Sequence, residues 1–195
     1  MEKMSKRNRI GKVLMSAGTI LIVCALLIVV YNNYVDQQAG AAADKIGAQV
    51  EELTTDAGGD SNPDIMDTVQ VDGNSYVGMI RIPALSINLP VLESWSLPNL
   101  KIAPCRYKGT AANNNLIICA HNYKKHFGLL NTLSTGDEVI FDDVKGKRIT
   151  YQVIEIVTLQ PTDVAKMEEG DWDLTLFSCT YMGYARVTVR CRRIY

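Results

Sequence analysis

Hydrophobic residues follow two contrasting patterns along this chain. From about Val13 to Tyr31 nearly every residue is apolar and none is charged (VLMSAGTILIVCALLIVVY). A helix of this length is long enough to span the ~30 Å hydrocarbon core of a bilayer. In the second half of the chain, short runs of alternating apolar and polar residues recur with turn residues between them. The first pattern predicts a transmembrane helix, and the second predicts a β-sheet domain.

The β-type region begins near Val71 and continues to the C-terminus. Its apolar runs are SYVGMIRIP, INLPVLES, NNLIICA, DEVIFDD, ITYQVIEIVTLQP, DLTLFSCTY and RVTVRCRRIY. Helix is sparse here, with single turns predicted at 98–102, 123–133 and 163–169. About seven or eight strands in such a short region favour a closed β-barrel or a sandwich.

Charge near the N-terminus predicts how the apolar helix is oriented. The basic residues that precede it are Lys3, Lys6, Arg7, Arg9 and Lys12, against Glu2 alone. Positive charge is retained on the cytoplasmic side, so the rest of the chain is predicted to lie outside. A cleaved signal peptide is the alternative. Its apolar core is usually about 7–15 residues with small residues close behind, whereas here the small residues Ala39 to Ala43 lie well beyond a longer run.

The segment between the span and the sheet differs from both. It is polar and alanine-rich to about Leu53, which favours helix. Gly, Pro and acidic residues then indicate a linker. The expected organisation is a basic cytoplasmic N-terminus at 1–12, a transmembrane anchor at 13–31, a helical stalk and linker at 32–70, and a catalytic domain at 71–195.

Composition excludes several classes of function. The net charge is −1, which gives no reason to expect nucleic-acid binding. Five cysteines are scattered without a CxxC pair, and with two histidines they show no zinc-ligand spacing. We therefore expect no metal and no cofactor. Cys119 is expected to be buried, and a bridge to Cys105 is left open.

Near the C-terminus one thiol is placed at the end of a strand. An alternating run leads to Cys179, a short turn follows, and the next strand opens with Arg186. If the turn centres on Met182–Gly183, Cys179 and Arg186 are directly opposed on one face, with Cβ atoms roughly 4.5–5.5 Å apart. Arg190 shares that face but lies about 13 Å further along the strand. Arg186 is therefore the predicted partner, and Arg190 the alternative.

His121 and His126 are the two histidines. His121 ends the apolar strand LIICA, which would fix its ring, whereas His126 follows two lysines and is expected to be exposed. A cation lowers the pKa of a neighbouring thiol, and an imidazole can transfer protons to and from amines. Cys179, Arg186 and His121 together therefore predict cysteine-based acyl transfer. No carboxylate is obviously placed to orient His121.

With these residues the chain resembles a sortase, the membrane-anchored cysteine transpeptidases of Gram-positive bacteria. The family's TLxTC signature is matched by Thr175–Cys179, its arginine pattern by Arg186–Arg190, and its Gly-His motif by Ala120–His121. Ser178 stands where the family has Thr, and Ala120 where it usually has Gly. The His121–Asn122 pair is similar to class B, while the short Cys–Arg turn is similar to other groups, so the subclass stays open.

The resemblance implies a sortase-type closed eight-stranded β-barrel with a few short helices, preceded by one transmembrane helix. It implies that Cys179 attacks an LPxTG-like sorting signal of an exported protein and forms a thioacyl-enzyme. A peptidoglycan precursor or a pilin lysine would then supply the accepting amine. His121 would transfer protons, and Arg186 with backbone N–H groups would hold the oxyanion. The enzyme would sit in the cell membrane with its catalytic domain outside.

Three other functions remain open at this point. A cysteine peptidase would transfer the acyl group to water instead of an amine. An inactive sortase-like adaptor would retain the fold without chemistry. A thiol sensor would pair Cys179 with another of the external cysteines.

Overall fold

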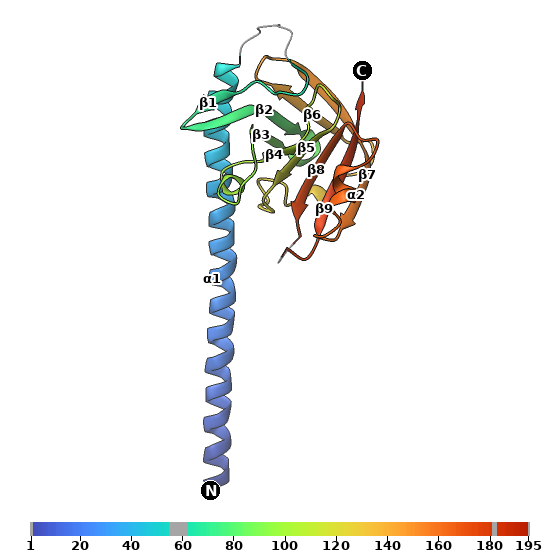
Figure 1. The fold of residues 1–195 in the computed structure, drawn as a ribbon. Coiled ribbons are helices and arrows are strands. Elements are labelled where there is room, and N and C mark those ends of the chain that lie inside the picture. Colours follow the sequence, from blue (N-terminus) through green and yellow to red (C-terminus); the bar gives the residue numbers. More distant parts are fainter. Residues whose placement is uncertain (1, 55–61, 181–182, 195) are drawn as a thin grey trace. The chain divides into compact units, whose positions relative to one another are not determined.

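The computed structural model describes residues 2–54, 62–180 and 183–194 (Figure 1). The chain divides into two compact units, Met1–Gln38 and Ala39–Tyr195. The helices are α1 (Glu2–Leu53) and α2 (Val164–Glu168), with 3-10 turns η1 (Pro83–Leu85), η2 (Asn99–Lys101) and η3 (Leu130–Thr132). The strands are β1 (Val69–Val71), β2 (Asn74–Ile82), β3 (Ile87–Leu92), β4 (Cys105–Lys108), β5 (Leu116–Ala120), β6 (Glu138–Asp143), β7 (Arg148–Leu159), β8 (Leu174–Cys179) and β9 (Arg186–Ile194).

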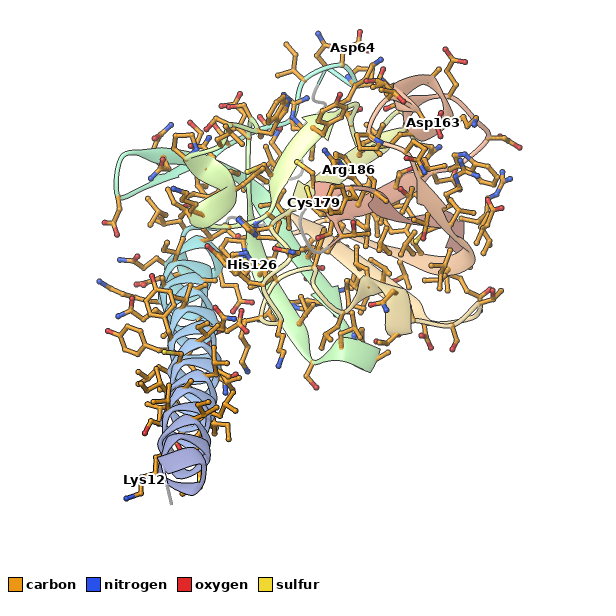
Figure 2. All side chains as sticks on the ribbon, turned by 90° about the horizontal axis from the view of Figure 1, so that it is seen from below. Lys12, Asp64, His126, Asp163, Cys179 and Arg186 are labelled. Atoms are coloured by element: carbon orange, nitrogen blue, oxygen red, sulfur yellow. The ribbon has the colours of Figure 1, made fainter. Side chains whose placement is uncertain are left out.

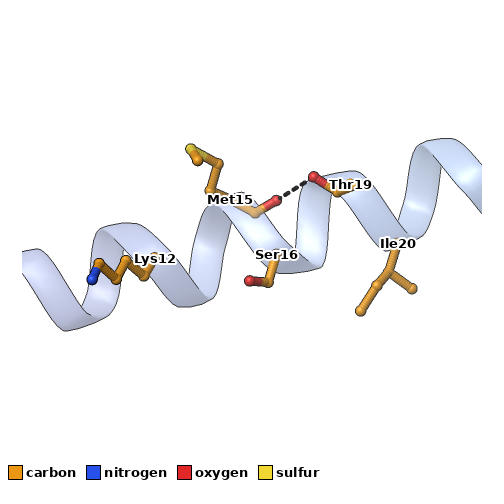
Figure 3. A pocket seen from close by; sticks show the side chains of 5 residues that line it. All are labelled: Lys12, Met15, Ser16, Thr19 and Ile20. Carbon is orange, nitrogen blue, oxygen red and sulfur yellow. Dashed lines mark hydrogen bonds between the residues drawn. The ribbon is translucent and has the colours of Figure 1, made fainter.

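The first unit is helical throughout its described length. Helix α1 is long and apolar enough, from Ile10 onward, to be a candidate membrane span. Its large apolar side chains between Val13 and Tyr31 are exposed, as a lipid-facing helix requires. Figure 3 shows the face at Lys12, Met15, Ser16, Thr19 and Ile20. There the Thr19 hydroxyl donates to the Met15 carbonyl at 2.9 Å, so a polar group within the apolar run is satisfied inside the helix.

The second unit is a closed, mixed β-barrel. Its strands follow the order β2-β3-β4-β5-β8-β9-β7-β6, and β6 pairs back onto β2 to close the ring. Two pairings, β3 with β4 and β5 with β8, are parallel and the others are antiparallel. Strand β1 pairs with β2 alone at the edge. The eight-stranded barrel expected from the sequence is confirmed.

Two hydrophobic clusters occupy the two faces of the barrel wall. The interior cluster is built from alternate residues of the strands, among them Leu116, Ile118, Leu174, Leu176 and Val189. The second cluster lies on the outer face of β2 to β5 and includes Tyr76, Met79, Cys105 and Cys119. Residues of α1 cover it, because Ile46 and Val50 pack against these side chains and Val50 is fully buried. Glu51 also pairs with Arg81 at 2.8 Å.

The end of α1 therefore belongs to the same compact unit as the barrel. The helical turns expected at 98–102, 123–133 and 163–169 are confirmed by η2, η3 and α2. Residues 55–61 of the expected linker lie outside the described residues. The functional boundaries at residues 12, 31 and 70 stay predictions.

Candidate functional site

Three adjacent strands bring the predicted residues to one level of the barrel wall. In the antiparallel pair β8–β9, Cys179 and Arg186 are Cα partners, as the turn length predicted. In the parallel pair β5–β8, the last partners are Ala120 and Ser178. The residues that follow are His121, immediately after β5, and Cys179, the last residue of β8. Neighbouring strands lie ~4.8 Å apart. His121, Cys179 and Arg186 thus follow one another across the sheet.

Alternation puts all three side chains on the outer face of the barrel. Ala120 belongs to the interior cluster and Ser178 is buried, so the residues that follow them point outward. Cys179 and His121 are half-buried, which leaves the thiol and the imidazole accessible. Figure 2 shows Cys179 and Arg186 beside one another on the ribbon.

Hydrogen bonds across the turn fix the Cys179–Arg186 hairpin. Thr180 donates its N–H to the Ala185 carbonyl, and the Ala185 N–H donates to the Thr180 hydroxyl, both at 2.9 Å. Gly183 adopts a φ of +76°, a left-handed conformation that favours glycine. Its carbonyl accepts a bond from Arg186 Nη1 at 3.1 Å. The predicted turn residues 181 and 182 lie outside the described residues.

The two candidate arginines have different surroundings. Within the described part of the chain, Arg186 forms no ion pair, and its Nη1 bonds only the carbonyls of Gly183 and Ala185. Arg190 is paired with Glu155 at 2.6 Å and donates to the Lys166 carbonyl at 2.7 Å. Its guanidinium also lies 4.6 Å from the centre of the Trp172 ring. Arg190 is therefore held by structural contacts, whereas no carboxylate among the described residues pairs with Arg186.

His121 is held by the two residues that follow it. The Asn122 Oδ1 lies 2.8 Å from His121 Nδ1, and the Asn122 N–H points to the same nitrogen at 3.0 Å. The Tyr123 ring stacks on the imidazole, with centroids 4.1 Å apart and planes 3° from parallel. The sequence showed the Asn122–Tyr123 pair but gave no sign that both side chains return to His121.

The expectation that His126 is exposed was wrong. Its side chain is fully buried and meets the Tyr123 ring edge-on at 5.4 Å. The loop turns tightly, because Tyr123 O accepts the N–H groups of both His126 and Gly128 at 2.9 Å. This turn carries His126 inward although two lysines precede it.

Burial separates Cys179 from the other thiols of the barrel. Each cysteine in the described part of the chain is a free thiol, so Cys105 and Cys119 are not bridged here although they are register partners. Burial raises the pKa of Cys105 and of Cys191 to about 12. Burial, with a smaller contribution from Cys105, also raises the pKa of Cys119. These thiols remain protonated at neutral pH, so Cys179 is the candidate nucleophile. Among the described residues, no three His, Cys, Asp or Glu side chains gather as metal ligands would.

An aromatic row extends from the strand that carries Cys179. Phe177 lies two residues earlier on the same face of β8 and meets Tyr107 edge-on, with ring centroids 5.4 Å apart. Tyr107 in turn lies 5.8 Å from Trp95, which is about half exposed. The face beside the thiol is therefore apolar and aromatic.

Comparison with known proteins finds sortases, both by a family model and among solved structures. The family model of the sortase domain matches residues 80–194. Sortase C1 from Streptococcus agalactiae is 26% identical with a TM-score of 0.55, over 65% of this chain and 71% of that chain. Sortase C from Streptococcus pneumoniae was solved in a study of catalysis and pilin substrate specificity. It is 23% identical with a TM-score of 0.56, over 83% of this chain and 89% of that chain.

Sortase C from Clostridium perfringens was solved with the C-terminal cell wall sorting motif. It is 21% identical with a TM-score of 0.56, over 82% of this chain and 89% of that chain. The two likenesses under 25% identity show the fold alone. No curated protein matches the chain.

Proposed function

Because the chain belongs to the sortase family, we propose that it is a cysteine transpeptidase that cleaves an LPxTG-like sorting signal through a thioacyl-enzyme on Cys179. The observation that carries this proposal is the order of His121, Cys179 and Arg186, which lie just after β5, at the end of β8 and at the start of β9 on three neighbouring strands. A nucleophile, a proton-transferring group and a fixed cation are what acyl transfer by a thiol requires.

In the first half-reaction, the Cys179 thiolate attacks the carbonyl carbon of the threonine-like residue in the signal. A C–S bond forms, and the carbonyl π electrons move to the oxygen. Arg186 would stabilise this oxyanion, since its guanidinium keeps its charge at every working pH. His121 then gives its proton to the departing amine as the C–N bond breaks. The thioester and the downstream peptide are the products.

In the second half-reaction, an amine attacks the thioester carbonyl and His121 takes a proton from it. The C–S bond breaks and returns the thiolate to Cys179. The acceptor would be a peptidoglycan precursor or a pilin lysine. The pilin substrate specificity named for one class C relative supports a pilin acceptor, and the sorting motif bound to another supports a sorting-signal substrate. Attack by water would instead make the protein a peptidase.

We propose that α1 anchors the enzyme in the cell membrane with its N-terminus in the cytoplasm. The basic residues before the apolar run support this orientation. The barrel would then work outside, where exported proteins and cell-wall amines are found.

Intact mass spectrometry tests the proposal directly. The full-length protein in detergent is mixed with LPxTG-like peptides, with and without an amine acceptor. We expect an acyl adduct that maps to Cys179 and a ligated product that requires the amine. A product formed by water alone would indicate a peptidase. The absence of any adduct, together with a Cys179 thiol that does not react with iodoacetamide, would favour an inactive adaptor.

A further inference from the structure

We propose that Asn122 and Tyr123 form a clamp that positions the imidazole of His121 and reserves its Nε2 for proton exchange. The proposal rests on the proposed function, because it assigns the part that a carboxylate plays in other cysteine and serine enzymes. In this chain two residues of the loop that follows His121, namely Asn122 and Tyr123, meet the His121 ring.

Asn122 can bond His121 Nδ1 in either protonation state. A ring nitrogen donates when it carries a proton and accepts when it does not. The Asn122 Oδ1, at 2.8 Å, can accept from a protonated Nδ1, and the Asn122 N–H, at 3.0 Å, can donate to a bare one. The shorter contact is to the oxygen, which favours Nδ1–H. With Nδ1 occupied by Asn122, protons must enter and leave the ring at Nε2.

Tyr123 restricts the orientation of the ring. Its phenol plane lies 3° from that of the imidazole at a centroid distance of 4.1 Å, so rotation of the imidazole out of this plane is sterically opposed. The face of an aromatic ring also attracts a cation within about 6 Å. The same stack therefore favours the imidazolium that donates to the leaving amine.

Other residues of the same loop hold Asn122 and Tyr123 in place. His126 is buried against the edge of the Tyr123 ring, and the Tyr123 carbonyl accepts two backbone N–H groups. A Cβ at Gly128 would overlap the carbonyl oxygens of Asn122 and Tyr123, so the loop closes because residue 128 is glycine. These contacts hold both clamp residues where they meet His121.

Two pairs of substitutions, one at Asn122 and one at Tyr123, test whether these residues position the His121 ring or only pack against it. Asn122→Ala removes the Oδ1 acceptor, whereas Asn122→Asp keeps an acceptor in place. We expect Asn122→Ala to lower kcat about 10- to 100-fold, the range seen when the partner that orients a metal-binding histidine is lost. We expect KM to be little changed and Asn122→Asp to restore most of the rate. Asn88→Ala, which removes an asparagine that accepts from Arg81 on β2, is the matched control.

The second pair tests the stack. We expect Tyr123→Leu to lower kcat about 3- to 10-fold, which corresponds to the coupling of an aromatic pair. Tyr123→Phe keeps the ring and should retain the wild-type rate. Equal losses in Tyr123→Phe and Tyr123→Leu, or in Asn122→Asp and Asn122→Ala, would overturn the clamp.

A spectroscopic readout tests the clamp without any substrate. The chain has two histidines, so ¹⁵N-histidine labelling of the full-length protein in detergent gives a simple spectrum of four ring nitrogens. We expect neutral His121 to carry its proton on Nδ1 in the wild type and in Asn122→Asp, and on Nε2 in Asn122→Ala. An unchanged tautomer in Asn122→Ala would refute the proposal even if transpeptidation is found. The expected change would support it even if the enzyme proved inactive with every peptide.

Discussion

Replacing each of the two candidate arginines of β9, Arg186 and Arg190, by lysine should have two different effects. Arg186→Lys keeps the charge but loses the planar fork beside Cys179. Removal of one oxyanion donor typically costs about 10²- to 10³-fold in kcat. We expect that loss for Arg186→Lys with a melting temperature close to that of the wild type, because in the described part of the chain Arg186 bonds two carbonyls of its own turn and no carboxylate.

Arg190→Lys should instead reduce stability. A lysine can keep the contact with Glu155 but not the bond to the Lys166 carbonyl or the stack on Trp172. A hydrogen bond from a charged group is worth about 1.5–3 kcal/mol, and a cation–π contact about 0.5–2 kcal/mol. The Arg190 side chain is 12% exposed, so solvent screens these contacts little. The sum, roughly 2–5 kcal/mol, corresponds to a fall of about 4–20 °C in melting temperature for a unit of this size.

Both variants are measured by thermal melting and by steady-state transpeptidation of a peptide that acylates the wild type. The rate of folded Arg190→Lys should stay close to that of the wild type, because Arg190 is engaged with Glu155, Lys166 and Trp172 and not with the reacting groups. An Arg186→Lys enzyme with a near-normal rate, beside a folded but inactive Arg190→Lys, would show that Arg190 is the working cation.

Further predictions concern stability and thiol reactivity. A protein that begins at residue 71 should have a lower melting temperature than one that begins at residue 39, because burial of the Val50 side chain alone contributes about 1.5–3 kcal/mol. Equal melting temperatures would show that the helical segment does not stabilise the barrel. Iodoacetamide at pH 8 should label Cys179 in the native protein and spare Cys105. Peptide mapping measures the labelling, and the protein unfolded in urea, where both thiols react, is the control. Equal labelling of the two thiols in the native protein would contradict the prediction. Burial raises the pKa of Cys105 from its ordinary value of 9.0 to about 12. The unfolded chain therefore loses this proton at a lower pH than the folded chain, and the free energy of unfolding should fall as the pH rises from 9 to 12. A urea midpoint that stays constant over this window would contradict the prediction. Gly128→Ala should reduce kcat, since its new methyl group displaces the loop carbonyls, and a wild-type rate with an unchanged melting curve would show that the loop adapts.

The sequence predicted the contacts that depend on a short stretch of chain. The Cys179–Arg186 pairing followed from the length of one turn, because antiparallel register is set locally. The sequence did not predict in the same way that His121 would lie beside Cys179. Strands β5 and β8 are parallel and far apart in the chain, so their register depends on how the whole barrel closes. The chemistry of a thiol and an imidazole suggested that the two residues act together, but no local pattern gave their register.

Long-range partners account for the other features that the sequence did not predict. Arg190 is held by residues of β7 and of the segment between β7 and β8, and no local pattern relates these to β9. The apolar stripe of the alanine-rich helix was thin, yet Val50 is fully buried as a member of the outer cluster. His126 was misjudged because its neighbours in sequence are charged, whereas its burial is determined by the turn at Tyr123.

The parallel pairing of β5 with β8 also has a consequence for when the thiol becomes reactive. The partners Ala120 and Ser178 are separated by β6, β7 and α2, so they meet only after a long loop has closed, and such contacts form slowly. Until then Cys179 has no imidazole beside it, whatever stage its own hairpin has reached. We expect a newly synthesised chain to carry an ordinary thiol until the barrel is complete, which delays acylation until the polypeptide has finished folding.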